Sequence, residues 1–346
     1  MDVAVVIPTY ERREALLATL GSLEQIDYPA GRWEAIVVDD GSGPATVAAV
    51  RDWIHASGMP VRLLQQERRG PASARNAGAR LASARVLIFI DNDIIVGPNF
   101  LRRHLEILAG HPGCWVIGRI VHPPELRQTP FGRYRDDRWE AFHARHRTGD
   151  VVETDGMTAA NLALPTEDFR SLGGFDETFS IASCEDWDLG QRARARRVRV
   201  LYDPTNVAVH NDWAIGLDQF CRRQMLYSIS DVLLWRKYGA ESPRARLVTE
   251  NGPLRWGNDS VKLLVKKMVK WLLARRAGRG AVRLICALSE VVAPDSPFNV
   301  RSYDLAVGIS IFRGVREGLA RCGGSLKASK FRLAREDRTA KPENQD

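Results

Sequence analysis

Short apolar runs alternate with longer segments of helical spacing over the first hundred residues. Four runs are rich in Val, Ile, Leu and Ala, which is typical of strands buried on both faces of a sheet. They cover residues 3–7, 35–38, 61–64 and 86–90. Between them, apolar residues recur every three or four positions, which predicts helices at 11–26, 46–57 and 72–83. Strands that alternate with helices indicate βαβ units and a mostly parallel sheet flanked by helices.

The pattern is less regular further on. The spacing predicts helices at 100–109, 185–196 and 219–238, and strands at 115–121, 158–164 and 198–202. Residues 122–148 have no clear period and predict a long loop with no more than one helix, whereas the chain beyond residue 257 is predicted to be helical.

These elements predict an α/β domain at 1–240, in which 1–98 has the pattern of a nucleotide-binding half and 99–240 forms an acceptor and catalytic half. A helical basic region is expected at 241–334 and a disordered tail at 335–346.

The charge of the chain is unevenly spread. The 346 residues have a formal net charge of +8, but residues 261–346 contain 18 Lys or Arg and 8 Asp or Glu, a net charge of +10. The first 260 residues therefore carry −2. A basic end on a near-neutral body predicts an anionic partner surface, either membrane lipid or nucleic acid.

Five cysteines without CxxC spacing argue against a disulfide framework or a zinc site and favour a reducing cytosol. The N-terminus lacks the features of a signal peptide, and no apolar stretch is long enough to span a bilayer. We therefore expect a cytoplasmic protein.

Residues 261–273 predict an amphipathic helix. Its lysines, at Lys262, Lys266, Lys267 and Lys270, fall on one face, and its apolar residues fall on the other. A basic amphipathic helix with a Trp suits an anionic membrane surface, which would make the protein peripheral on the cytoplasmic face. A helix packed on the catalytic domain with a solvated basic face has the same pattern, so both interpretations stay open.

Two carboxylates close the apolar run at 86–90. The triplet Asp91-Asn92-Asp93 follows that strand directly. Ligands of open α/β sheets bind beyond the carboxyl ends of the strands, and carboxylate oxygens are preferred by Mg²⁺. The triplet is a candidate metal site, and a solvated turn is the alternative.

Two further polar groups lie near the same predicted edge. Asp39 and Asp40, after the strand at 35–38, could accept hydrogen bonds from a base or a ribose, although an Asp-Gly turn has the same sequence. Arg75 and Asn76 lie in a small-residue helix start, where they could contact a phosphate and a sugar. Close packing of that helix on the sheet is the alternative.

Carboxylates also gather at the start of the helix at 185–196. Glu185 and Asp186 could supply a general base, although acidic residues are common in a first helical turn. His210 follows a strand-like run and is either a metal ligand or a structural histidine.

As an ordered set, these motifs closely resemble those of the family-2 glycosyltransferases of GT-A fold. The resemblance covers roughly residues 1–240 and rests on the following segments. They are Pro8-Thr9-Tyr10-Glu11-Arg12, Val38-Asp39-Asp40-Gly41-Ser42, Ala74-Arg75-Asn76-Ala77-Gly78, Asp91-Asn92-Asp93, Gly173-Gly174-Phe175-Asp176-Glu177, Glu185-Asp186 and His210.

The resemblance implies a donor site, a metal site and a base at the matching positions. The nucleotide-sugar contacts would be Pro8, Tyr10, Glu11, Asp39, Asp40, Arg75, Asn76, Asp91 and Asn92, with Asp39 in a supporting role. The ligands of Mg²⁺ or Mn²⁺ would be Asp93, Asp91 and His210, with Asp93 as the direct ligand. Asp186 would be the catalytic base and Glu185 its neighbour.

The family transfers a sugar from a nucleotide diphosphate to a hydroxyl with inversion. The resemblance thus implies a metal-dependent inverting enzyme of cell-surface glycan or glycoconjugate biosynthesis, with a UDP-sugar as default donor and a glycan or lipid-linked acceptor. The Gln-x-x-Arg-Trp motif of processive synthases is absent, and Cys221-Arg222-Arg223-Gln224-Met225 stands in that region, which favours single-sugar transfer.

Two alternatives are weaker. A nucleotidyltransferase would have a Gly-rich basic segment after the first strand, where this chain has Pro8-Thr9-Tyr10-Glu11. A non-catalytic protein that binds nucleotide-sugar or nucleic acid through the basic tail would leave the carboxylate series unexplained. We therefore expect no nucleic-acid partner.

Overall fold

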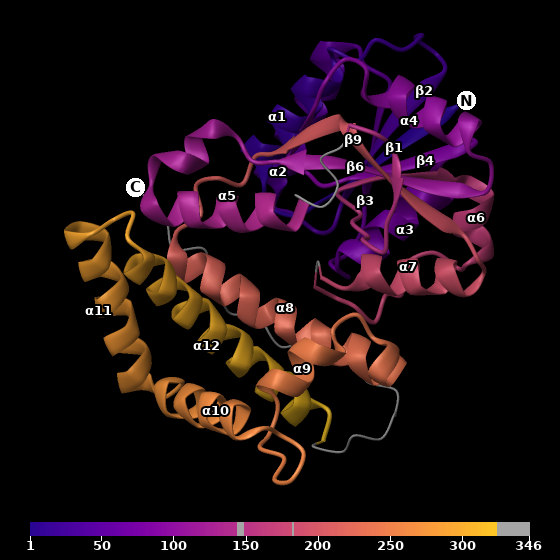
Figure 1. Ribbon diagram of the computed structural model, residues 1–346. Coiled ribbons are helices and arrows are strands. Elements are labelled where there is room, and N and C mark those ends of the chain that lie inside the picture. Colours follow the sequence, from indigo (N-terminus) through magenta and orange to yellow (C-terminus); the bar gives the residue numbers. More distant parts are fainter. Residues whose placement is uncertain (144–148, 182, 324–346) are drawn as a thin grey trace.

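The computed structural model describes residues 1–143, 149–181 and 183–323, and a nine-stranded sheet with helices on both faces forms its centre (Figure 1). The strands are β1 (Val3–Thr9), β2 (Trp33–Asp39), β3 (Val61–Gln65), β4 (Val86–Ile90), β5 (Ile94–Val96), β6 (Cys114–Val121), β7 (Val152–Glu153), β8 (Asn161–Pro165) and β9 (Arg199–His210). The order across the sheet is β3-β2-β1-β4-β8-β6-β9-β5, and β7 also pairs with β9.

The sheet has a parallel half and a mixed half. Strands β3, β2, β1 and β4 are parallel, as the alternation of strands and helices predicted. Strand β8 runs antiparallel to both β4 and β6, and β5 and β7 run antiparallel to β9, while β6 and β9 are parallel. The sheet as a whole is therefore mixed rather than mostly parallel, because an apolar run in the sequence carries no information about strand direction.

The helices flank this sheet and continue into a C-terminal bundle. They are α1 (Arg13–Leu23), α2 (Pro44–Ser57), α3 (Pro71–Leu81), α4 (Phe100–Gly110), α5 (Pro130–His143), α6 (Thr166–Ser171), α7 (Glu185–Ala195), α8 (Leu217–Tyr238), α9 (Ala245–Asn251), α10 (Val261–Leu273), α11 (Arg276–Val292) and α12 (Pro297–Arg321), with 3₁₀ turns at Pro124–Gln128 and Gly239–Glu241. The sequence did not predict the short elements β5, β7 and α6, whereas α9 lies within the helical region expected at 241–334.

Alternate residues of β1 face two separate cores. Val3, Val5 and Ile7 pack in the core that includes α1 and α4, whereas Ala4 and Val6 pack in the core of α3 and α7. Helix α3 lies very close to the second face: a Cβ on its Gly78 would stand 2.5 Å from Val6 Cγ1. The small residues of α3 thus serve close packing on the sheet, which was one of the two interpretations of this segment.

The irregular segment at 122–148 holds a 3₁₀ turn and the helix α5, with residues 144–148 outside the described ranges. Its apolar positions have no helical period because α5 packs through aromatic rings and charges. Phe131 packs edge-to-face against Tyr303 of α12 and Tyr134 packs against it at a tilt, with ring centroids 5.2 and 5.1 Å away. Arg133 pairs with Asp295 at 2.7 Å. Helix α5 therefore connects the sheet to the C-terminal bundle.

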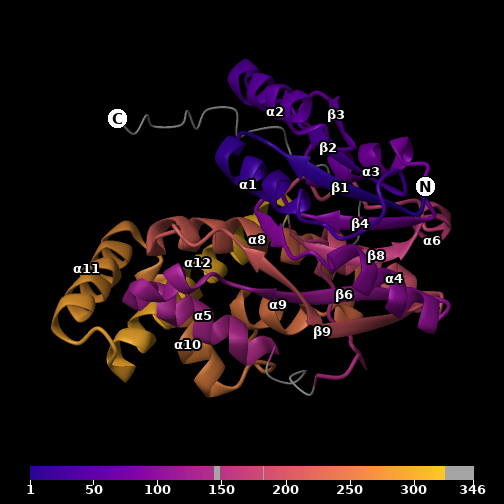
Figure 2. The ribbon, with the colours of Figure 1, turned by 90° about the horizontal axis from the view of Figure 1, so that it is seen from above.

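Helices α8 to α12 form a layer beside the sheet (Figures 1 and 2). Helix α12 lies against α8, and Gly314 permits this, since a Cβ there would stand 2.1 Å from Met225 O. The helical region beyond residue 257 is confirmed as far as residue 323, whereas its predicted continuation at 324–334 and the predicted disordered tail at 335–346 lie outside the described residues. Among the residues described, none of the helices is both long and apolar enough to cross a membrane.

Helix α10 has the predicted bounds, and its contacts show which of its two faces packs inward. Lys267 is 1% exposed and donates to Asp259 Oδ2 at 2.6 Å, and Lys270 donates to Asn251 Oδ1 at 2.7 Å. The interpretation with a fully solvated basic face therefore does not hold for these two lysines. The apolar face of α10 is the one that meets solvent.

Candidate active site

The candidate residues gather at one edge of the sheet. Strands β1, β2 and β4 are parallel, so the segments that follow their carboxyl ends lie together there. The start of α3, the start of α7 and the end of β9 converge on the same edge, as the contacts below demonstrate. Motifs that are far apart in the sequence therefore form a single cluster of charged groups.

Asp93 and His210 face each other across this cluster. His210 Nε2 lies 3.3 Å from Asp93 Oδ1, and Arg12 Nη1 lies 2.5 Å from Asp93 Oδ2. Burial alone would raise the pKa of Asp93, but the charges of His210 and Arg12 outweigh it and hold that pKa well below its usual range. Burial likewise works against charging His210, yet Asp93, Asp212 and Asp91 together raise its pKa. The structure therefore brings together two of the three predicted metal ligands.

The third predicted ligand, Asp91, faces a different partner. Arg75 is buried and donates through Nη2 to Asp91 Oδ1 at 2.5 Å and through Nη1 to Glu185 Oε1 at 2.7 Å. Burial disfavours its charge, but the two carboxylates raise the pKa of Arg75 overall. Arg75 thus joins the triplet after β4 to the acidic start of α7, instead of forming a surface pair.

Asp186 is the less constrained of the two carboxylates at the start of α7. Its Oδ1 accepts the main-chain N–H of Trp187 at 2.7 Å, and no side chain among the described residues donates to it. Burial is the main cause that raises the pKa of Asp186, and burial also raises that of Glu185 against the opposing charge of Arg75. A carboxylate with a raised pKa and no cation bound to it is suited to accept a proton.

The residue before this pair holds an unusual backbone conformation. Cys184, the N-cap of α7, has φ +73°, and its Sγ donates to Asp231 Oδ1 at 3.3 Å. A non-glycine residue in the left-handed region costs energy and persists only where its surroundings hold it. The contact with Asp231 on α8 is one such constraint, and it fixes how α7 presents Glu185 and Asp186.

Several predicted donor contacts instead hold neighbouring loops in place. Asp40 accepts hydrogen bonds from Gln66 Nε2, Arg69 N and Gly70 N at 2.7, 2.8 and 2.7 Å. The carboxylate of Asp39 accepts only from Ser42 N among the described residues, at 3.2 and 3.3 Å to its two oxygens. Asp39 therefore has more capacity left for a ligand than Asp40.

Asn76 and Asn92 also have internal partners. Asn76 donates to Phe175 O at 2.9 Å and accepts from Phe175 N at 2.8 Å, so it ties α3 to the Gly-Gly-Phe loop. Asn92 donates to Thr9 Oγ1 at 2.9 Å and joins β4 to β1. Pro8 is buried within β1, so a ligand could reach it only through its main chain.

The loop after β1 is held against the loop after β2. Glu11 has φ +51°, its main-chain N–H donates to Ser42 Oγ at 2.9 Å, and its Oε1 accepts from Gly43 N at 2.6 Å. Tyr10 remains 37% exposed, with the guanidinium of Arg68 over its ring at 3.9 Å. Tyr10 thus offers an aromatic face at the edge of the site.

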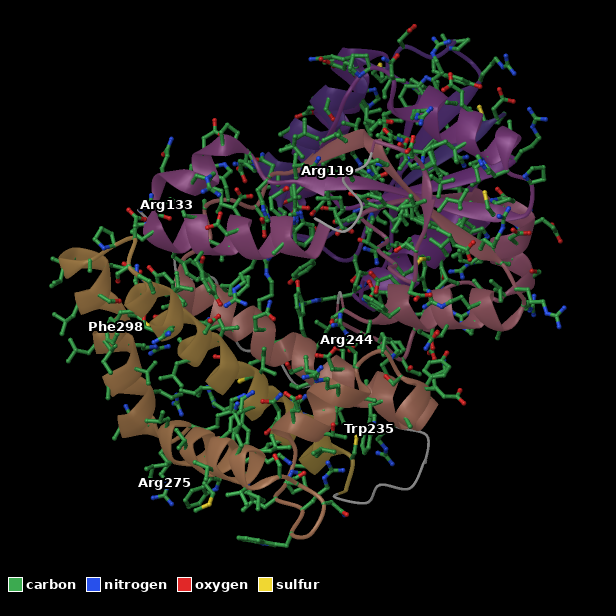
Figure 3. The ribbon with its side chains drawn as sticks, in the orientation of Figure 1. Arg119, Arg133, Trp235, Arg244, Arg275 and Phe298 are labelled. Atoms are coloured by element: carbon green, nitrogen blue, oxygen red, sulfur yellow. The ribbon has the colours of Figure 1, made fainter. Side chains whose placement is uncertain are left out.

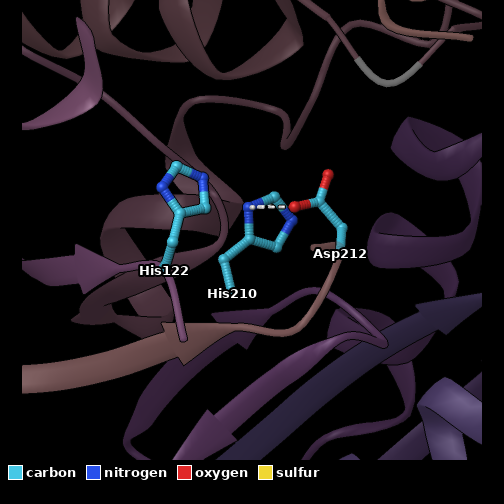
Figure 4. Close-up of side chains that lie close together, drawn as sticks. All are labelled: His122, His210 and Asp212. Carbon is cyan, nitrogen blue, oxygen red and sulfur yellow. Dashed lines mark ion pairs between the residues drawn. The ribbon is translucent and has the colours of Figure 1, made fainter. Parts of the chain in front are cut away.

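A second charged group, which the motifs did not predict, lies next to His210. Asp212 is buried and lies 3.1 Å from Arg135 Nη2, 2.6 Å from Arg223 Nη1 and 3.7 Å from His210 Nδ1. His122 stacks beside His210, with centroids 6.1 Å apart (Figure 4). The position of Asp212, two residues after the end of β9, was the available signal in the sequence.

The donor atoms fit a divalent cation at two places. Asp93 Oδ1 is buried without a hydrogen-bond partner in the described chain, and it faces His210 Nε2 at 3.3 Å. Two ligands about 2.1 Å from an octahedral cation lie roughly 3 Å apart, which matches this pair. His122, His210 and Asp212 also place one ligand atom each within 4.8 Å of one another, but two guanidinium groups already neutralise Asp212. The pair Asp93 and His210 is therefore the better fit.

Comparison with known proteins gives one consistent family. Residues 4–159 match the model described as Glycosyl transferase family 2. The chain is 33% identical over 220 residues to a validoxylamine A glucosyltransferase of Streptomyces hygroscopicus subsp. jinggangensis, covering 56% of this chain and 52% of that protein. It is 31% identical over 173 residues to the glycosyltransferase AglE of Haloferax volcanii, covering 50% and 55%. The chain thus spans about half the length of these curated relatives.

A solved structure extends the similarity to most of the chain. The mannosyltransferase PcManGT of Pyrobaculum calidifontis, in complex with GDP-Man and Mn²⁺, aligns with a TM-score of 0.58 at 20% identity over 90% of this chain and 86% of that one. At this identity the match bears on the fold alone, and it confirms the predicted α/β fold with its helical C-terminal region. The comparisons therefore match residues 4–159 to the family that the ordered motifs resemble, and they place the chain on the fold of a solved glycosyltransferase.

Proposed function

We propose that the protein transfers a single sugar from a nucleotide diphosphate sugar to an acceptor hydroxyl, with inversion at the anomeric carbon. One observation carries the proposal. Buried Arg75 contacts Asp91, from the triplet of the candidate cation ligands, and Glu185, the neighbour of the candidate base. A group that binds a leaving diphosphate and a group that accepts a proton thereby belong to one site.

Asp186 is the general base in this proposal. It takes the proton of the acceptor hydroxyl while that oxygen forms a bond to C1 of the donor sugar. The bond from C1 to the diphosphate breaks at the same time, and the diphosphate leaves with the bonding electrons. No covalent bond between sugar and protein is needed, so the configuration at C1 inverts.

The cationic side of the site acts on the leaving group. A divalent cation bound by Asp93 and His210 would neutralise charge on the departing diphosphate. Arg12, whose side chain is 41% exposed and lies on Asp93, can turn to the diphosphate when that carboxylate binds a cation. Two solved glycosyltransferases of similar fold, PcManGT and GalNAc-T7 (TM-score 0.51), contain Mn²⁺, which supports the need for a divalent ion.

The donor base is proposed to lie between the loops after β1 and β2. Asp39 has acceptor capacity for a base N–H or a ribose hydroxyl, while Asp40 and Glu11 keep the surrounding loops in position. Tyr10 offers a ring on which a base could stack in place of Arg68. UDP is the default by resemblance, and the two solved relatives bind GDP-Man and UDP respectively. The acceptor is proposed to be a glycan or a lipid-linked sugar, which would place the enzyme in glycan biosynthesis.

A thermal-shift panel tests the proposal. We expect one nucleoside diphosphate and its sugar derivative to raise the melting temperature in the presence of Mn²⁺ and much less without it, because a ligand that binds only the folded state stabilises it. The sugar nucleotide that shifts the protein should then be hydrolysed slowly, with release of a sugar of inverted anomeric configuration.

Absence of any shift from a folded protein would overturn the proposal. Salt-dependent binding of nucleic acid without binding of sugar nucleotides would instead support the non-catalytic alternative.

A further inference from the structure

The two outer helices of the C-terminal bundle expose continuous apolar stripes. Of the 19 large apolar side chains that are exposed in the described residues, 15 lie between residues 254 and 300. On α10 and α11 they recur at helical spacing, so each helix turns one apolar face to solvent. Ten of them are Val261, Val265, Met268, Val269 and Leu272 on α10, and Leu284, Ile285, Leu288, Val291 and Val292 on α11; Trp271 on α10 is exposed as well. We call these ten side chains the outer apolar face.

The side chains of the outer apolar face are highly exposed. Val291 and Val292 are 83% and 80% exposed, and Val261 is 78% exposed. Single exposed apolar residues are ordinary, but contiguous apolar patches on a soluble surface mark a place where something binds. The chain around them extends the patch, since Trp256 and Phe298 are 74% and 61% exposed (Figure 3 labels Phe298).

The orientation of α10 is fixed by buried polar contacts on its other side. Lys267 Nζ is held by Asp259 Oδ2 at 2.6 Å and by Pro253 O at 3.0 Å, and both charged side chains are at most 1% exposed. Turning the apolar face inward would break this ion pair, and an unpaired buried charge is costly. The inner side of α11 packs separately, through Val282 and Cys286 against α12. The outer apolar face is therefore a stable surface of the folded protein.

The surroundings of this face are strongly basic. Residues 261–323 contain twelve Lys or Arg and four Asp or Glu. Arg275, at the corner between α10 and α11 (labelled in Figure 3), lies over the ring of Trp271 at 4.2 Å. A Trp beside an Arg is a pairing suited to a lipid headgroup layer, since the ring spans the apolar and polar zones.

A cavity of about 310 Å³ adjoins α11 on its inner side and is lined by arginines. Arg279 and Arg283 of α11 line it with Arg222 of α8 and Arg313 of α12. Asp218 also lines it and pairs with Arg283 at 2.9 Å, so the remaining guanidinium groups are in excess. Such a cluster suits the oxygens of a phosphate group.

We propose that the outer apolar face docks onto an anionic lipid bilayer, with its side chains at the acyl boundary and Arg275 and the other exposed basic side chains around it at the lipid phosphates. Charge distinguishes the bilayer from two other partners for this face, which are a second copy of the chain and the residues after 323. A second copy of the chain would bring two basic surfaces together, and the residues after 323 are themselves net basic, with six Lys or Arg and four Asp or Glu. An anionic bilayer complements both the apolar stripes and the surrounding positive charge. The inference concerns the C-terminal helices and does not depend on the proposed transfer reaction.

Vesicle flotation tests this inference. We expect the wild-type protein to float with vesicles of mixed phosphatidylglycerol and phosphatidylcholine and to stay in solution with phosphatidylcholine alone. The double variant Leu288→Glu/Val291→Glu should lose binding about tenfold or more, because two carboxylates would have to enter the apolar layer. Both positions are exposed, so the variant should keep the melting temperature of the wild type.

A matched control separates position from net charge. The variant Ala48→Glu/Ala56→Glu adds the same two charges on exposed positions of α2, and it should float nearly as well as the wild type. Flotation of the Leu288→Glu/Val291→Glu variant at the wild-type level would overturn the proposal, as would a wild-type protein that ignores anionic vesicles. Light scattering gives a third outcome: a wild-type dimer that this variant dissociates would assign the face to a second copy instead.

Discussion

Arg75 Nη1 lies 2.7 Å from Glu185 Oε1, although the two residues are 110 positions apart in the chain, and both side chains are buried. The guanidinium therefore fixes the start of α7 against the start of α3. Because Arg75 also contacts Asp91, a shift of one carboxylate would change the position of the other. This relationship links the acidic triplet after β4 with the candidate base.

Replacing Arg75 by Met should both destabilise the protein and inactivate it. The substitution leaves Glu185 buried without its cation, and loss of one partner of a buried pair costs about 3–5 kcal/mol. Urea unfolding measures this change. The control is Arg85→Met, which removes an Arg that pairs with Asp2 and is 79% exposed, and which should cost less than about 1 kcal/mol. Equal losses in the two variants would contradict the structural role of Arg75.

Asp186→Asn should abolish transfer and leave the donor affinity nearly unchanged. An amide keeps the size of the carboxylate and cannot accept the proton, and a positioned base contributes about 10²–10⁴-fold to the rate. Single-turnover kinetics and donor titration on the same sample separate the two effects. A correctly folded variant that binds the donor weakly would assign Asp186 to the donor site instead.

The two candidate cation sites predict different effects of substitution. If Asp93 and His210 hold the ion, Asp93→Asn should weaken Mn²⁺ binding in the presence of nucleotide, whereas His122→Asn should leave it nearly intact. Because Asp93 Oδ1 has no other partner in the described chain, its loss should cost about tenfold or more in affinity. Titration followed by Mn²⁺ electron paramagnetic resonance checks this. Equal sensitivity of both variants would favour the group of His122, His210 and Asp212.

Neighbouring glycines provide a matched pair for the loop that Asn76 holds. Gly173 and Gly174 have φ +79° and +74°, but a Cβ on Gly173 would meet no atom within 4 Å, whereas one on Gly174 would stand 2.6 Å from Asn76 Oδ1. Gly173→Ala should cost roughly 1–2 kcal/mol from the backbone conformation. Gly174→Ala should cost about 1–3 kcal/mol more, because it displaces a hydrogen-bonded buried amide. Equal melting temperatures would show that the contact with Asn76 is unimportant.

Much of the fold could be predicted because its signals are local. The four parallel strands are continuous apolar runs, and α1 to α3 have a clear 3.6-residue period. Helix α5 was obscured because its contacts are aromatic rings and ion pairs rather than an apolar stripe. The orientation of α10 could not be predicted, because the partner of Lys267 is Asp259, which lies outside the helix. A pattern on one helix identifies two faces but not which of them packs inward.

The order of the motifs predicted which segments form the candidate site, but it predicted the role of each residue less well. Arg12 stands 81 positions before Asp93, so nothing local indicates that pair. Asp40 and Asn76 are polar residues beside the candidate site. The sequence alone cannot distinguish a polar side chain that holds a loop in place from one that binds a ligand. The structure makes the distinction through the number of internal partners each has.

The buried histidine His104 should make the protein sensitive to acid. Burial lowers the pKa of His104 to about 4, against the smaller opposing effect of its contact with Asn161 Oδ1 at 2.8 Å. Because the unfolded chain has the ordinary histidine pKa of about 6.5, it binds more protons than the folded chain between that pH and 4. The free energy of unfolding should therefore fall as the pH drops from 6.5, by about 1.4 kcal/mol per unit for this group.

His104→Gln removes the titrating group and keeps an amide that can pair with Asn161. Chemical unfolding of both proteins between pH 7 and 5 measures the effect, and the difference between the two curves cancels the carboxylates and the other histidines. We expect that difference to change by about 2 kcal/mol between pH 6.5 and 5 in favour of the variant. Parallel curves would mean that His104 can be protonated within the folded protein at little cost.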